Sequence, residues 1–192
     1  NITAALSLQL AESALSANIL AQIPLSDPRA ITIAIEVPEV AIAEDDSLVQ
    51  LATKYVAELE ASATLAATAN LRFLGSQPHV TGRLQLREGC GTLDKFSIAG
   101  LALEVPFING VILRTIEKPS LSFKKLSVGD IHMDHGQVDF QVTKRGLFVE
   151  AADVGMCEGF LRAYAIAWDF KNPQSDFVVY FDRIDLGEAL MM

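Results

Sequence analysis

The residues that come nearest to a metal site are His132, Asp134 and His135, three potential ligands that lie close together. In an extended strand, His132 and Asp134 share one face, whereas His135 points elsewhere. No further Cys or His follows at the spacing of a zinc site. Because Asp-His-Gly also suits the positive φ angles of a turn, we interpret this segment as a solvated hairpin tip.

The two cysteines are the next candidates for chemistry. A nucleophile at Cys90 or Cys157 would need a base such as His79, yet neither cysteine lies at a recognisable helix N-terminus or in a familiar nucleophile motif. Each lies beside glycine, as expected of small residues at strand bends, and the sequence leaves open whether the two pair. Gly89-Cys90-Gly91 lacks the third glycine and the helix of a phosphate loop. No carboxylate pair stands out as acid and base, so we expect a non-enzyme without metal or cofactor.

Composition narrows the class of partner. The chain has 192 residues, of which 51% are hydrophobic, and its 24 acidic and 15 basic residues give a net charge of -9. The basic residues are scattered, which argues against binding to nucleic acid. No apolar run reaches the roughly 18 residues of a membrane span. The chain opens inside a strand-like pattern without Met, so we interpret residues 1–192 as a single β-rich domain excised from a longer protein.

The element that would position any site is a sheet. Apolar side chains from Ala61 to Phe73 alternate with polar ones, a period of two that predicts an unusually long strand. A turn at 75–78 then leads into a second alternating run from Val80 to Leu86, so the two should form a hairpin.

The same alternation recurs along most of the chain. We expect a first strand that starts at Ile2 and could continue past Glu12 to a turn at 24–28, a bulge, edge or stop at Pro38, and a bulge at Ala99-Gly100. An amphipathic helix is predicted at about 46–60, with Asp46 or Ser47 as N-cap and Leu48, Leu51, Tyr55, Val56 and Leu59 on one face. Another helix should start near 185. The predicted fold is mainly β, a long antiparallel meander sheet that is curved or groove-like.

The function depends on what the apolar face of this sheet contacts. One alternative is a structural or adhesive module whose apolar rows meet in a closed core, and another is a carbohydrate or small-molecule binder, which would need clustered aromatic residues. A third is an open trough that holds lipid, because a large apolar surface is not normally left in water. We expect this lipid groove to be lined by Leu65, Leu71, Phe73, Leu84, Leu86, Phe140, Trp168, Phe170, Val179 and Phe181.

The last third of the chain carries a family resemblance. Its segments are LSVGDIHMDHGQVDF at 126–140, FVEAADVGMCEG at 148–159, AIAWDFKNP at 165–173 and FVVYFDRIDL at 177–186. This succession of a strand ending in a turn glycine, a glycine-containing strand, a D-x-x-N-P turn and an alternating strand into I-D-L resembles the C-terminal region of the YdbH-type branch of AsmA-like envelope proteins. That family has also carried a dicarboxylate-transport label, but no arginines or lysines are grouped here to hold a dianion.

The resemblance implies a membrane-anchored envelope protein of a Gram-negative-type bacterium. Its β groove would lie in the periplasm and conduct phospholipid between the inner and outer membranes, and its anchor would be in segments missing from this chain. An outer-membrane lipoprotein is the implied protein partner.

Overall fold

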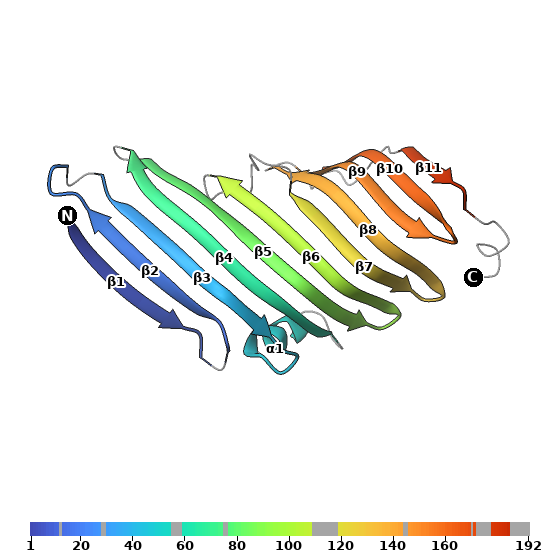
Figure 1. Cartoon of the computed structure of the whole chain (residues 1–192), viewed down its shortest axis with the longest axis horizontal. Helices are drawn as coiled ribbons and strands as arrows, with labels where there is room; N and C mark the ends of the chain where they lie inside the picture. The colour runs from blue at the N-terminus through green and yellow to red at the C-terminus, as the bar shows by residue number, and fades with distance from the viewer. Residues whose placement is uncertain are drawn as a thin grey trace.

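Eleven strands form one antiparallel sheet in the order in which they occur along the chain, so each strand pairs with its sequence neighbours (Figure 1). The computed structural model describes residues 1–11, 13–27, 30–54, 59–74, 77–108, 119–143, 146–169, 171 and 178–184. The sheet is not closed, and β1 and β11 lie at its two edges. The predicted class, a mainly β antiparallel meander, is therefore confirmed.

Among the described residues, one short helix interrupts the strands, between β3 and β4. The elements are β1 (Ile2–Gln9), β2 (Ser16–Ile23), β3 (Thr32–Ile42), α1 (Ser47–Thr53), β4 (Glu60–Leu74), β5 (Gln77–Leu93), β6 (Phe96–Ile108), β7 (Ser120–Val128), β8 (Ile131–Val142), β9 (Gly146–Met156), β10 (Gly159–Asp169) and β11 (Val178–Asp182).

The predicted long hairpin is present as β4 and β5. Leu71 lies opposite Val80 and Leu65 lies opposite Leu86, as the alternation required. The first strand, however, is shorter than expected: β1 ends at Gln9, and a separate strand, β2, pairs with it. A turn closed by the amide of Leu10, which donates to the carbonyl of Leu15 at 3.0 Å, separates the two strands.

The helix is also shorter than the predicted 46–60, and it presents a different residue to the sheet. The Asp46 side chain caps α1 by accepting from the backbone N–H of Leu48 at 2.9 Å, which confirms one of the two expected N-caps. Val49 is the buried residue of the helix, whereas Leu51 is 50% exposed. Residues 55–58 and the expected helix from 185 lie outside the described residues.

The orientation of α1 is set by polar contacts as well as by packing. Besides capping the helix, the Asp46 carboxylate accepts from the Ser13 hydroxyl at 2.8 Å and from the Ala14 backbone N–H at 3.0 Å. These hydrogen bonds, with that from Leu48 the largest contributor, lower the pKa of Asp46. The carboxylate thereby ties the β1–β2 turn to the start of the helix.

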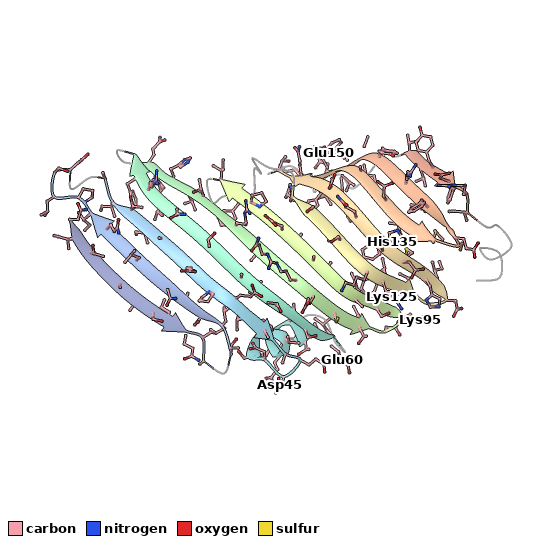
Figure 2. All side chains as sticks on the ribbon, in the orientation of Figure 1. Asp45, Glu60, Lys95, Lys125, His135 and Glu150 are labelled. Carbon is pink, nitrogen blue, oxygen red and sulfur yellow. The ribbon has the colours of Figure 1, made fainter. Side chains whose placement is uncertain are left out.

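Bulges interrupt the pairing in several strands. β3 has an extra residue between Val37 and Val40, where Pro38 predicted an irregularity, and Gly100 in β6 has a φ of 66°, as expected for the predicted bulge. His135 was predicted to lie in a hairpin turn, and that prediction is wrong. It is a bulge residue with a φ of 31° inside the continuous strand β8, and Figure 2 shows it in the body of the sheet.

Candidate functional site

One face of the sheet is apolar across its whole width. Residues directly opposite each other in an antiparallel pair place their side chains on the same face. The observed pairing therefore connects one residue from each strand from β3 to β11 into a single row, and every member of that row is apolar. The row consists of Val40, Leu65, Leu86, Leu103, Leu121, Val138, Ala152, Ala163 and Val179.

We call the surface that contains this row the apolar face. The rows on either side of it are also apolar. Ile2, Leu6 and Leu8 of β1 lie on this face, because their partners in β2 share a face with Ile33 and Ile35 of β3. At its paired positions in the described strands, this face has no charged, amide or hydroxyl side chain.

The predicted lining residues fall on the apolar face wherever the structure describes them. Leu84 and Phe181 each lie two residues from a member of the row, and Phe73 lies an even number of residues from Leu65, so all three share its face. The residues brought to this face are Leu65, Leu71, Phe73, Leu84, Leu86, Phe140, Trp168, Val179 and Phe181, while Phe170 lies outside the described residues.

The helix covers one part of this face. Among the described elements, α1 packs over it, and Val49 helps to line a cavity of about 260 Å³ with Ile42, Leu86 and Leu101. A cavity of that size is below the roughly 300–1,000 Å³ of typical small-molecule pockets, so it could enclose only part of a lipid. Elsewhere on the face exposure varies: Val105 and Phe123 are buried, whereas Trp168 and Phe181 are more than half exposed.

The total accessible surface is consistent with the single sheet that the described residues form. It is 12929 Å², whereas a compact monomer of 20.8 kDa exposes about 8,900 Å². Large apolar side chains account for part of the excess, because Trp168 is 53% exposed and Phe181 is 69% exposed.

Two glycines let aromatic rings lie close to the apolar face. Gly82 pairs with Phe107 in β6, and Gly136 pairs with Phe123 in β7. A Cβ on Gly136 would come within 2.2 Å of the Phe123 ring, and one on Gly82 would come within 2.3 Å of the Phe107 ring. Each ring therefore occupies the space of the missing side chain across the strand pair, which shields backbone that glycine would leave exposed.

The opposite face, which we call the polar face, is held by charged side chains. Arg83 and Glu104 form an ion pair at 2.8 Å between β5 and β6, and Arg162 of β10 lies 2.8 Å from Asp153 and 3.4 Å from Asp182. These side chains remain partly exposed, so each pair contributes little to stability. Their arrangement keeps the charge on one side of the sheet.

An aromatic group on the polar face at β10 and β11 was not predicted from the sequence. Tyr164 and Tyr180 meet edge to face at 5.9 Å, and Arg162 lies 5.7 Å above the ring of Phe160. A cavity of about 470 Å³ lies between the tyrosines, Arg162 and Val178. Tyr164, Ile166 and Trp168 are spaced by two, which predicts one face for all three residues. An irregularity at Ala165, where φ is 56°, places Tyr164 on the polar face instead.

The residues considered for chemistry are dispersed in the structure. His132 contacts the Ser127 hydroxyl at 3.0 Å, and the His135 ring meets Phe160 at 5.7 Å. Within the described part of the chain, no group of three His, Cys, Asp or Glu residues could hold a metal ion. Cys90 and Cys157 do not form a disulfide.

A scan against protein-family models found no match, and searches of curated proteins and of solved structures found none either. None of the helices in the described residues is long and apolar enough to cross a membrane. The functional argument therefore depends on the geometry of the apolar face.

Proposed function

We propose that the apolar face binds the acyl chains of phospholipid and conducts them along the sheet. The observation that carries this proposal is the uninterrupted apolar row from β3 to β11, over which the described residues place no second sheet. A continuous apolar surface of this extent is a recognised sign of a lipid or protein interaction site.

The dimensions and energies support a hydrocarbon ligand. Nine strands at about 4.8 Å spacing make the row roughly 38 Å long, which exceeds half of a bilayer core of about 30 Å, the depth that one acyl chain fills. Burial of each methylene is worth about 0.8 kcal/mol, so a chain of about sixteen carbons could gain on the order of 12 kcal/mol if fully buried. An acyl chain that contacts the sheet on one side only would gain part of this free energy.

The biological setting is proposed from the resemblance in residues 123–190. It supports a periplasmic segment of an AsmA-like, inner-membrane-anchored envelope protein that carries phospholipid between the inner and outer membranes, with an outer-membrane lipoprotein as partner. In this proposal the apolar face supplies binding surface and performs no catalysis.

The structural-module alternative required a closed, dry core. The sheet is not closed, and the large side chains Trp168 and Phe181 are more than half exposed. This geometry favours the lipid proposal over the closed-core alternative.

Two neighbouring residues of β4 provide a matched test. Leu71 lies on the apolar face opposite Val80, whereas Asn70 lies on the polar face opposite Thr81. A fluorescent fatty acid should bind the wild-type chain, and Leu71→Asp should weaken binding by about tenfold or more because a carboxylate would have to be desolvated against the acyl chain. Asn70→Asp adds the same carboxylate on the other face and should leave binding unchanged.

Circular dichroism should show that both variants keep the wild-type β content. Phe140→Asp repeats the test at β8. Lipid extraction of the purified chain followed by mass spectrometry should also recover phospholipid. The proposal would be refuted if the folded wild-type chain did not bind the fluorescent fatty acid. It would also be refuted if Leu71→Asp and Asn70→Asp weakened binding equally.

A further inference from the structure

The polar face has a cavity with the features of a ligand site. This cavity of about 470 Å³, which we call the tyrosine cavity, is lined by Arg162, Tyr164, Ala165, Val178 and Tyr180. Its volume falls within the roughly 300–1,000 Å³ of small-molecule sites. Because it lies on the face opposite the proposed lipid surface, an argument about its ligand does not depend on lipid binding.

Two tyrosine rings supply the apolar part of the tyrosine cavity. Tyr164 of β10 is 38% exposed and Tyr180 of β11 is 57% exposed, and the rings meet edge to face with their centroids 5.9 Å apart. Clustered aromatic residues are what a carbohydrate binder requires. A sugar ring presents C–H groups that are attracted to the negative face of an aromatic ring, so the exposed part of Tyr180 offers a stacking surface.

The polar groups beside the rings are mainly hydrogen-bond acceptors. The Arg162 guanidinium contacts Asp153 at 2.8 Å and Asp182 at 3.4 Å, and Asp182 also contacts Arg183 at 3.4 Å. These ion pairs hold the carboxylates next to the rings. An ionised carboxylate has about four lone-pair sites, so both side chains can accept further hydrogen bonds. Sugar hydroxyls supply the O–H donors that these acceptors need.

The local charge determines which sugars fit. Asp139 lies in the same row as Tyr164, because Ala151 is a pairing partner of both. With Asp153 and Asp182 it gives three carboxylates, which outnumber the two guanidinium groups that contact Asp182. A phosphate or an acidic sugar would therefore be repelled.

We infer that the tyrosine cavity binds a neutral glycan, with one sugar ring stacked on Tyr180 and its hydroxyls donating to Asp153 and Asp182. A proline-rich peptide, which also docks on aromatic side chains, fits the polar groups less well. Proline lacks an N–H, so such a peptide would offer carbonyl acceptors to carboxylates that are themselves acceptors. A neutral glycan suits both the rings and the carboxylates.

Titration calorimetry with two neutral oligosaccharides, cellotetraose and chitotetraose, tests this inference on the wild-type chain. At least one of them should bind with a dissociation constant of about 1 mM or tighter. Tyr180→Ala should raise this constant about fivefold or more because the stacking surface is lost, whereas Tyr180→Phe keeps the ring and should stay within about twofold of the wild type.

The matched control is Phe148→Ala. The Phe148 ring also lies on the polar face, opposite Gln141, and is 38% exposed like Tyr164, but it does not line the tyrosine cavity. Its loss should leave sugar binding unchanged. Circular dichroism should show the wild-type β content for every variant, as expected for substitutions at partly exposed side chains.

Three results would overturn the inference. The first is that neither neutral oligosaccharide binds at concentrations up to about 10 mM. The second is that Tyr180→Ala and Phe148→Ala weaken binding equally, which would place the sugar elsewhere. The third is that tetragalacturonate, an acidic oligosaccharide of the same length, or a proline-rich peptide binds at Tyr180 more tightly than the neutral sugars do.

Discussion

Two phenylalanines on opposite faces of the sheet show how differently those faces are packed. Phe123 on the apolar face is 5% exposed and lies over Gly136, whereas Phe148 on the polar face is 38% exposed and lies opposite Gln141. Some side chains of the apolar face, such as Phe123, are therefore buried, while others, such as Trp168, remain exposed. The polar face is joined across strands mainly by ion pairs and hydrogen bonds. The apolar face therefore contributes to the stability of the sheet as well as being the surface to which we assign the proposed lipid.

The largest effect should come from truncating the buried ring. Phe123→Ala should lower the free energy of unfolding by about 3–5 kcal/mol, the usual loss for a buried phenylalanine. Phe148→Ala, the control on the polar face, should cost less than about 1 kcal/mol because its ring is already partly in water. Urea unfolding followed by circular dichroism measures both. Equal losses would show that the two faces are packed alike.

A smaller loss is expected from filling the space beneath the ring. Gly136→Ala should destabilise the chain by about 1–3 kcal/mol, since its Cβ would clash with Phe123. Phe123→Leu removes most of the clashing atoms, so the double variant should lose less than the sum of the single losses. Additive losses in the same urea assay would show that the ring does not occupy this space.

The stability of the fold around α1 should depend on pH through Asp46. Its pKa in the folded chain is lowered from an ordinary value of about 3.9 by hydrogen bonds from Leu48, Ala14 and Ser13. The carboxylate therefore stabilises the fold above that value, and its contribution is lost as the pH falls through the lower folded pKa. Asp46→Asn keeps a capping side chain but cannot titrate.

Thermal unfolding between pH 7 and pH 2 tests this prediction. The wild-type chain should be more stable than Asp46→Asn at neutral pH, and the difference should narrow in acid. A difference that is constant with pH would mean that the carboxylate charge has no part in holding α1.

The smallest effect should be on the polar face. Arg162→Met should destabilise the chain by less than about 1 kcal/mol, because Arg162, Asp153 and Asp182 are all more than a third exposed. The loss should shrink further in 1 M NaCl, which screens exposed charges. Thermal unfolding of both chains at low and high salt measures this loss. A loss of several kcal/mol that does not change with salt would contradict the prediction.

Much of the sheet was predictable because an alternating pattern determines the face of each residue once the strand is known. The β4–β5 hairpin and the Gly100 bulge follow from residues that are adjacent in sequence. The end of β1 was not predicted, although the sequence carries a signal for it. Apolar residues occupy even positions from Ile2 to Leu8 and odd positions from Ala17 to Ile23. Such a change of parity requires a bulge or a turn.

Other features depended on contacts that are distant in sequence. The orientation of α1 follows from the contacts of Asp46 with the β1–β2 turn, so its helical pattern wrongly favoured Leu51 over Val49. Asp134-His135-Gly136 has the composition of a turn, but Gly129 at a φ of 62° already lies in the β7–β8 connection. Gly136 instead accommodates the ring of Phe123 from the neighbouring strand.

The order of the strands has a consequence for how this architecture can vary. Every strand pairs only with the strands next to it in the chain, so no central core joins distant parts of the described sheet. Removing or duplicating one hairpin would alter the width of the molecule by two strands without rebuilding the remainder, as in solenoid repeats. Width is therefore an adjustable quantity in this fold, and genetic gain or loss of hairpins offers a simple route to proteins of different span.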